Sequence, residues 1–159
     1  MKARKGFTLV ELLIVIVIIG ILAAGMLLSS GSTTDSAEAS NVISDLRNLK
    51  AACLLFYGDN VDQTDLAGFV LTLEQVAPYM DNPVRITAPG SGYAAGNIGN
   101  NWFVGFHVGA RNDNIQRRMA SRARAIGFFA GPAGGPSDPL THYTAGAGGN
   151  AGYVWMIAR

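Results

Sequence analysis

The chain has 159 residues, which is enough for about one folded domain. Its 12 lysines and arginines against 11 acids give a net charge of +1. Three of these bases, Lys2, Arg4 and Lys5, lie in the first six residues, so 12 minus three leaves nine bases against 11 acids in the rest. Bulk charge therefore gives no support for nucleic-acid binding, and the single cysteine, Cys53, excludes an intrachain disulfide.

Residues 7–28 form an apolar segment that only Thr8, Glu11, Gly20 and Gly25 interrupt. Because a hydrocarbon core needs roughly 20 helical residues, this segment is long enough to span a membrane. A charge inside such a segment costs about 3 kcal/mol near the centre and less toward an end, so Glu11 is expected to have a role and a partner. A cation at the start of a neighbouring helix would be that partner, which predicts a subunit that polymerises.

A secretory signal peptide and a plain single-pass anchor are the alternative interpretations of this segment. Residues 23–25, Ala-Ala-Gly, would supply a signal-peptidase site. The apolar segment is longer than the roughly 7–15 residues of a signal core, and neither alternative explains Glu11.

One stretch of the chain begins with Gly6-Phe7-Thr8-Leu9-Val10-Glu11 and continues through residue 15, and a second covers residues 19–24. Over these two stretches the chain closely resembles the N-terminal segment of type IV pilins and type II secretion pseudopilins. The resemblance covers the leader and the first half of the N-terminal helix only. It implies that a prepilin peptidase cleaves between Gly6 and Phe7, that the new Phe7 amine is methylated, and that Glu11 neutralises this amine on the next subunit. It also implies a helical homopolymer, an assembly ATPase and an inner-membrane platform protein as partners.

The chain departs from the family pattern at two places. Many members have a proline where this chain has Leu28, and many have a C-terminal cysteine pair that this chain lacks. Any local melting of the helix would then depend on Gly20 and Gly25, each about 1 kcal/mol less favourable in a helix than alanine.

The expected fold is α+β, with one long N-terminal helix packed on a small antiparallel sheet, as the resemblance implies. Its expected parts are a leader (1–6), a membrane or filament-core helix (7–30), an amphipathic continuation (31–58) and a globular head (59–159). Apolar residues at helical spacing predict that the continuation packs on the head; they are Val42, Leu46, Leu49, Cys53 and Phe56. Asp35 or Ser36 is a plausible N-cap if the helix breaks there, and Gly58 stands where a C-cap glycine is expected.

In the head, Thr72-Leu-Glu-Gln75 reads as a capping box that opens a short helix through about Met80. Aromatic and β-branched runs predict strands at 102–108 and 152–158, with 84–87 as a weaker third candidate. Asp113 is expected to cap a helix over about 114–126, with Ile115, Met119, Ala123 and Ile126 on its apolar stripe. The glycine-rich segments 131–136 and 145–150 read as mobile surface loops.

Other candidate sites are weaker. Arg117, Arg118 and Arg122, with Arg111 and Arg124 nearby, would contact DNA phosphates, but the solvated face of an amphipathic helix explains them better. His107 and His142 have no cysteine or acid near them in the sequence at the spacing of metal ligands. A calcium site usually needs several carboxylates, and Asp138 is the only acid after Asp113. We expect no metal, no cofactor and no catalytic motif, and Cys53 is expected to be a small core residue.

These observations predict a structural subunit of a type IV pilus-like filament that serves adhesion or motility. A type II secretion pseudopilin and a DNA-uptake pilin are the alternatives. The basic leader is expected to hold the N-terminus in the cytoplasm, with the head outside the inner membrane before assembly. After assembly, the subunit is expected in an extracellular pilus or a periplasmic pseudopilus.

Overall fold

The computed structural model describes residues 6–61, 69–136, 140–146 and 152–159, with the backbone alone for residues 28–32. It divides into two compact units, Met1–Asp35 and Ser36–Arg159. The 51-residue helix α1 (Leu9–Asp59) contributes to both, and each unit is described by itself. The expected α+β class is confirmed: a long apolar N-terminal helix is followed by short helices and a four-stranded antiparallel sheet.

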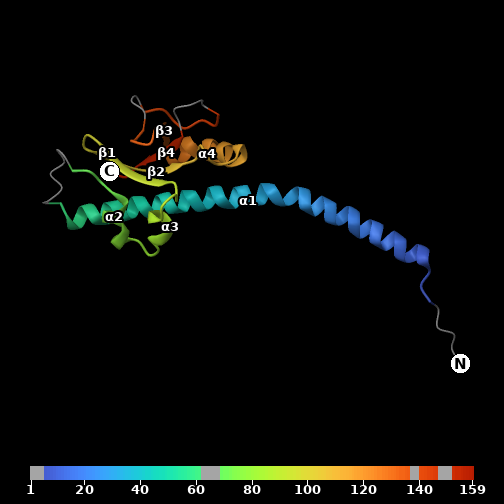
Figure 1. Cartoon of the computed structure of the whole chain (residues 1–159). Helices are drawn as coiled ribbons and strands as arrows, with labels where there is room; N and C mark the ends of the chain where they lie inside the picture. Colours follow the sequence, from blue (N-terminus) through green and yellow to red (C-terminus); the bar gives the residue numbers. More distant parts are fainter. Residues whose placement is uncertain (1–5, 62–68, 137–139, 147–151) are drawn as a thin grey trace. The chain divides into compact units, whose positions relative to one another are not determined.

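The second unit contains the folded head. Along the chain follow α2 (Leu73–Val76), the 3₁₀ helix η1 (Ala77–Tyr79), α3 (Val84–Thr87), β1 (Tyr93–Ile98), β2 (Asn101–His107), α4 (Asp113–Ile126), β3 (Phe128–Gly131) and β4 (Tyr153–Ile157). The sheet order is β1-β2-β4-β3, and every pair is antiparallel. Figure 1 shows the sheet and α4 on one side of this part of α1, and α2 and α3 on the other.

The core lies between α1 and the inner face of the sheet. Val42, Leu46, Leu49 and Cys53 are at most 3% exposed, which confirms the predicted apolar stripe, and Phe56 packs against them. The inner strand positions supply the opposing side chains, among them Trp102, Val104, Phe106, Val154 and Phe128. Burying large apolar side chains on both elements is the main force that holds the sheet on the helix.

The end of α1 differs from the expectation. The helix shows no break at Asp35 or Ser36, and it continues through Gly58 to Asp59. Gly58 has no positive φ and so is not a left-handed cap. Asn60 closes the helix instead, because its side-chain amide donates to the Phe56 carbonyl at 2.9 Å.

Several predicted elements of the head are confirmed. Strands β2 and β4 match the predicted runs, and the Thr72 amide donates to Gln75 Oε1 at 2.9 Å as the capping box requires. Helix α4 also forms, but its N-cap is Asn112, whose Oδ1 accepts from the Ile115 amide at 3.0 Å. Asp113, the predicted cap, is the first residue of the helix.

Residues 84–87 form the helix α3, so the third strand prediction was wrong. The preceding Pro83 has helical φ and ψ angles, and its carbonyl accepts hydrogen bonds from the amides of Ile86 and Thr87. Proline is well suited to the start of a helix because its φ is fixed near the helical value. Four residues are too few for their apolar pattern to distinguish a strand from one helical turn.

The glycine-rich segment 131–136 is a surface loop only in part, because residues 132–134 are exposed and the residues at its two ends are buried. It begins in β3 and crosses the outer face of the sheet, with Gly131, Gly135 and Pro136 buried. The indole N–H of the fully buried Trp155 donates to the Pro132 carbonyl at 3.0 Å. The segment 145–150 extends beyond the described residues.

Candidate functional site

The start of α1 places Glu11 in a local hydrogen-bond network with Thr8. The backbone N–H and the hydroxyl of Thr8 both donate to Glu11 Oε2 at 2.8 Å. In return, Thr8 Oγ1 accepts from the Glu11 amide at 3.2 Å. This is a reciprocal capping box, in which side chains satisfy backbone donors at a helix start that would otherwise have no partner.

Thr8 was missed as a functional residue, although its signal was present. The spacing Thr8-x-x-Glu11 is the sequence pattern of a capping box. The prediction rested on the charge of Glu11 within an apolar segment and did not include the threonine three residues before it. The contact turns the carboxylate back toward Thr8, the residue that follows Phe7 in the chain.

The surface around Glu11 is apolar and uncovered within its own unit. Leu9–Leu27 is long and apolar enough to cross a membrane, as judged by length and composition alone, with a mean hydropathy of 2.9. Its large apolar side chains, from Val15 at 47% to Leu9 at 79%, are all exposed. Such a surface is stable in lipid or against other apolar helices, and unstable in water.

Gly6 and Phe7 are both accessible. A Cβ atom placed on Gly6 would meet no atom within 4 Å, and Phe7 is 86% exposed. The bond between them therefore stands clear of the described fold ahead of α1. Its cleavage and the methylation of Phe7 remain predictions.

The candidate DNA-binding arginines do not converge on one site. Arg118 Nη1 donates to Ser36 Oγ at 3.2 Å, and Arg122 Nη1 donates to Ser40 Oγ at 3.4 Å, so both reach across to α1. Arg117 is exposed. Two of the three predicted phosphate contacts are thus used inside the head.

Arg111 likewise serves the fold. Its Nε lies 3.3 Å from Glu38 Oε1, and its guanidinium lies 5.4 Å from the centre of the Phe106 ring. Together with the two serine contacts of α4, this ion pair ties the segment around α4 to residues 36–40 of α1. Most of the arginines that cluster in this part of the sequence therefore make contacts within the fold.

Neither histidine has the surroundings of a metal ligand. The His107 ring stacks on Tyr153 with centroids 4.8 Å apart, and the His142 ring stacks on Phe129 at 5.2 Å. Among the described residues, no group of three histidine, cysteine or acidic side chains could hold a metal ion. Asp138, considered above for calcium, lies outside those residues.

Cys53 is fully buried in the core of the head. Burial raises the pKa of its thiol to about 12, because the apolar surroundings disfavour the thiolate. The thiol is therefore neutral at physiological pH and cannot act as a nucleophile there.

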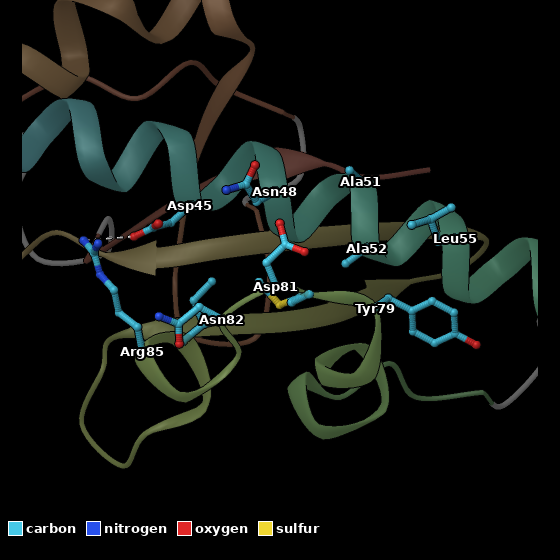
Figure 2. Close-up of a pocket in the computed structure, with 11 residues that line it drawn as sticks. Asp45, Asn48, Ala51, Ala52, Leu55, Tyr79, Asp81, Asn82 and Arg85 are labelled. Carbon is cyan, nitrogen blue, oxygen red and sulfur yellow. Dashed lines mark ion pairs between the residues drawn. The ribbon is translucent and has the colours of Figure 1, made fainter.

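A cavity of about 390 Å³ lies between α1, η1 and α3. Figure 2 shows Asp45 and Asn48 entering it from α1, and Asp81, Asn82 and Arg85 facing them. Asp45 Oδ2 lies 3.1 Å from Arg85 Nη2 and also accepts from the Tyr93 hydroxyl. Burial, reinforced by Asp45, raises the pKa of Tyr93, so the phenol stays a donor.

Comparison with known proteins gives matches over the N-terminal part. A family model, described as the prokaryotic N-terminal methylation motif, matches residues 1–27. A fimbrial protein of Pseudomonas aeruginosa is 46% identical over 52 residues, which cover 33% of this chain and 34% of that protein. The type II secretion system core protein G of Klebsiella pneumoniae is 37% identical over 60 residues, 38% of this chain and 43% of that protein.

The chain therefore spans less than half of the length of these curated relatives. No solved structure matches it significantly.

Proposed function

We propose that this chain, whose first 27 residues form a prokaryotic N-terminal methylation motif, is the structural subunit of a helical type IV pilus-like filament that serves adhesion or motility. One observation carries the proposal. A single carboxylate, Glu11, lies near the start of an exposed apolar helix of membrane-spanning length that begins at Leu9, shortly after the Gly6–Phe7 bond.

Polymerisation is the step that Glu11 would control. Cleavage after Gly6 would leave a cationic amine on Phe7 at the positive end of the helix dipole. In an apolar bundle an unpaired amine and an unpaired carboxylate are both costly, whereas a pair is tolerated. The register in which Glu11 of one subunit meets the amine of the next is therefore favoured over all others.

Thr8 would hold the Glu11 carboxylate toward the N-terminus while the subunit is in the membrane, before it joins a filament. The capping box supplies two donors at 2.8 Å to one carboxylate oxygen. It lowers the cost of an acid in lipid before the intermolecular partner arrives. The other oxygen, Oε1, is the atom we assign to the incoming amine.

The apolar helices would leave lipid for the filament core without meeting water, since neighbouring helices replace the acyl chains. Before assembly the N-terminus would lie in the cytoplasm and the head on the far side of the inner membrane. A prepilin peptidase, an assembly ATPase and a platform protein are the partners that such a subunit needs.

A type II secretion pseudopilin is the second candidate, and the similarity to core protein G favours it. A pseudopilus ends in the periplasm, whereas a pilus extends from the cell. Electron microscopy of cells that produce the chain, with antibody labelling of its head, distinguishes the two by the presence of long surface filaments.

The assembly role is tested by Glu11→Gln, which keeps the size of the side chain and removes its charge, with Glu11→Asp as the matched variant that keeps the charge. Mass spectrometry of the parent should find Phe7 at the N-terminus carrying one methyl group. Glu11→Gln should be processed normally and yet yield few filaments, and Glu11→Asp should retain part of the yield. A parent that keeps residues 1–6, or a glutamine variant that polymerises like the parent, refutes the proposal.

A further inference from the structure

The charges of the head are divided between two sides of α1. An α-helix turns by roughly 100° per residue, so residues seven apart lie on nearly the same side. Ser40 and Arg47 are seven apart, as are Asp45 and Ala52, and Ala52 and Asp59. Arg47 and Asp45 are then roughly 160° apart around the helix.

One of these two sides is basic. The contacts of Arg118 with Ser36 and of Arg122 with Ser40 place α4 on the side of α1 that also carries Arg47. We call this the basic side and define it by the exposed residues Arg47, Arg117, Arg122 and Arg124; Asp113 in the first turn of α4 is its one described acid.

The other side is acidic. Asp45 lines the cavity with Asp81, and the Tyr79 hydroxyl is hydrogen-bonded to Asp59, so all three acids flank η1 and α3. We call this the acidic side and define it by Asp45, Asp59 and Asp81. Arg85 and Arg111 are the bases described on this side, and they are already paired with Asp45 and Glu38. Asp81 makes no ion pair within the described part of the chain, and Figure 2 shows it pointing toward α1.

Each side also has exposed apolar side chains. Leu55 is 58% exposed at the edge of the cavity, and Val84 on α3 is 72% exposed. On the basic side, Leu54 follows Arg47 by seven residues and is 45% exposed. An interface needs such an apolar centre within a charged rim, because exposed ion pairs alone contribute little affinity.

We propose that the basic side of one head docks on the acidic side of a second copy of this chain. The two sides are complementary in charge and lie on different faces of the same head. A contact between different faces is heterologous, and it adds copies in one direction instead of closing a dimer. The guanidinium of Arg117 or Arg124 would enter the cavity and meet Asp81, since arginine carries the planar donors that suit a carboxylate.

This interface rests on the proposed filament, because its geometry produces an open helical array. It would complement the N-terminal contact of Glu11, which acts in the filament core. The charges would favour the correct side of the neighbouring head during addition, and they would disfavour contacts between two like sides.

A charge-swap experiment on the full chain tests the proposal. Asp59→Arg/Asp81→Arg reverses the acidic side, and Arg117→Glu/Arg124→Glu reverses the basic side. Each double variant alone should lose about tenfold or more in filament yield, because every contact then joins like charges. The two variants produced together should recover assembly as an alternating copolymer, which also shows that both fold.

Cross-linking identifies the contacting sides directly, and the buried Cys53 adds no background. With a short bis-maleimide on sheared filaments, Asp81→Cys and Arg117→Cys should each give monomers alone. The double variant should give a ladder of multimers, and a co-assembled mixture of the single variants should give dimers. Dimers from either single variant, a double variant without a ladder, or cross-links only to proteins of other mass overturn the proposal.

The outcomes separate this inference from the proposed function. If the parent chain makes filaments but the two charge-swapped variants do not restore each other's assembly, the head interface is disproved and the role of Glu11 is unaffected. A parent chain that makes no filaments disproves the proposed function, and the interface with it.

Discussion

Substituting Gly105→Ala should destabilise the head, because the added methyl group would collide with a buried tryptophan. Gly105 on β2 lies opposite Trp155 on β4, and the indole ring covers it. An alanine Cβ at this position would lie 2.5 Å from Trp155 Cε3 and 2.7 Å from Cδ2 and Cζ3. These separations are about 1 Å shorter than a normal carbon–carbon contact.

The indole cannot move away without loss. It is fully buried beneath residues 132–136, and its Nε1 is bonded to the Pro132 carbonyl at 3.0 Å. Overpacking of this kind costs about 1–3 kcal/mol, and a broken hydrogen bond adds about 1 kcal/mol. At about 4 °C per kcal/mol for a domain of this size, the melting temperature should fall by about 8–16 °C.

The measurement is thermal unfolding of the detergent-solubilised chain, followed by near-ultraviolet circular dichroism of the tryptophans. Gly134→Ala is the matched control, because a Cβ there meets nothing within 4 Å and the residue has no positive φ. It should leave the melting temperature unchanged or raise it by a few degrees. A Gly105→Ala chain that melts within about 2 °C of the parent would refute the packing of Trp155 described here.

Three further predictions follow from other contacts. Thr8→Val should lower filament yield while Thr8→Ser retains it, because only serine keeps the hydroxyl that bonds Glu11 at 2.8 Å; equal yields in a shearing assay would contradict the role of the capping box. Arg118→Gln should cost at most about 1 kcal/mol and speed hydrogen exchange around Ser36, and unchanged exchange there would show that the contact at 3.2 Å is not formed in solution. The thiol pKa of Cys53 is raised from 9.0 to about 12, so the folded state holds its proton longer than the unfolded state. Unfolding free energy should therefore fall as pH rises from about 9 to 12, and a Cys53→Ala chain, less stable at neutral pH, should show a shallower decline.

The sequence predicted the elements whose side chains repeat with a clear period. The stripe from Val42 to Phe56 and the runs that became β2 and β4 were found because burial dictates their residue types. Glu11 was found because a charge in an apolar segment is rare. The capping-box spacing of Thr8 and Glu11 was also present in the sequence, although it was missed. What the pattern could not show was which contacts the arginines of α4 make.

The strands β1 and β3 were missed for two different reasons. β1 (Tyr93–Ile98) contains two alanines and a glycine, and it forms because the adjacent β2 supplies its hydrogen-bond partners. A signal did exist: Gly99, with a φ of +56°, and Asn100 form a two-residue hairpin turn. β3 has only four residues, too few to show a period of two.

The glycine-rich segment 131–136 was predicted only in part, since residues 132–134 are exposed but Gly131, Gly135 and Pro136 are buried. Glycine density suggested mobility, yet several of these glycines are required for close approach. A side chain on Gly131 would collide with the Gly135 carbonyl and with Pro136, and Gly135 has a φ of +142°. Composition alone does not distinguish a glycine that gives a loop conformational freedom from a glycine that is needed because a side chain would not fit.

The crossing of residues 132–136 over the sheet limits how this protein can be engineered. Peptide epitopes inserted there would displace the Trp155 indole and unseat the strand it belongs to. The exposed turn at Gly99 and Asn100 has no such neighbour, since a Cβ on Gly99 would meet no atom within 4 Å. Foreign sequences intended for display on a polymer of this chain should therefore be carried at that hairpin tip.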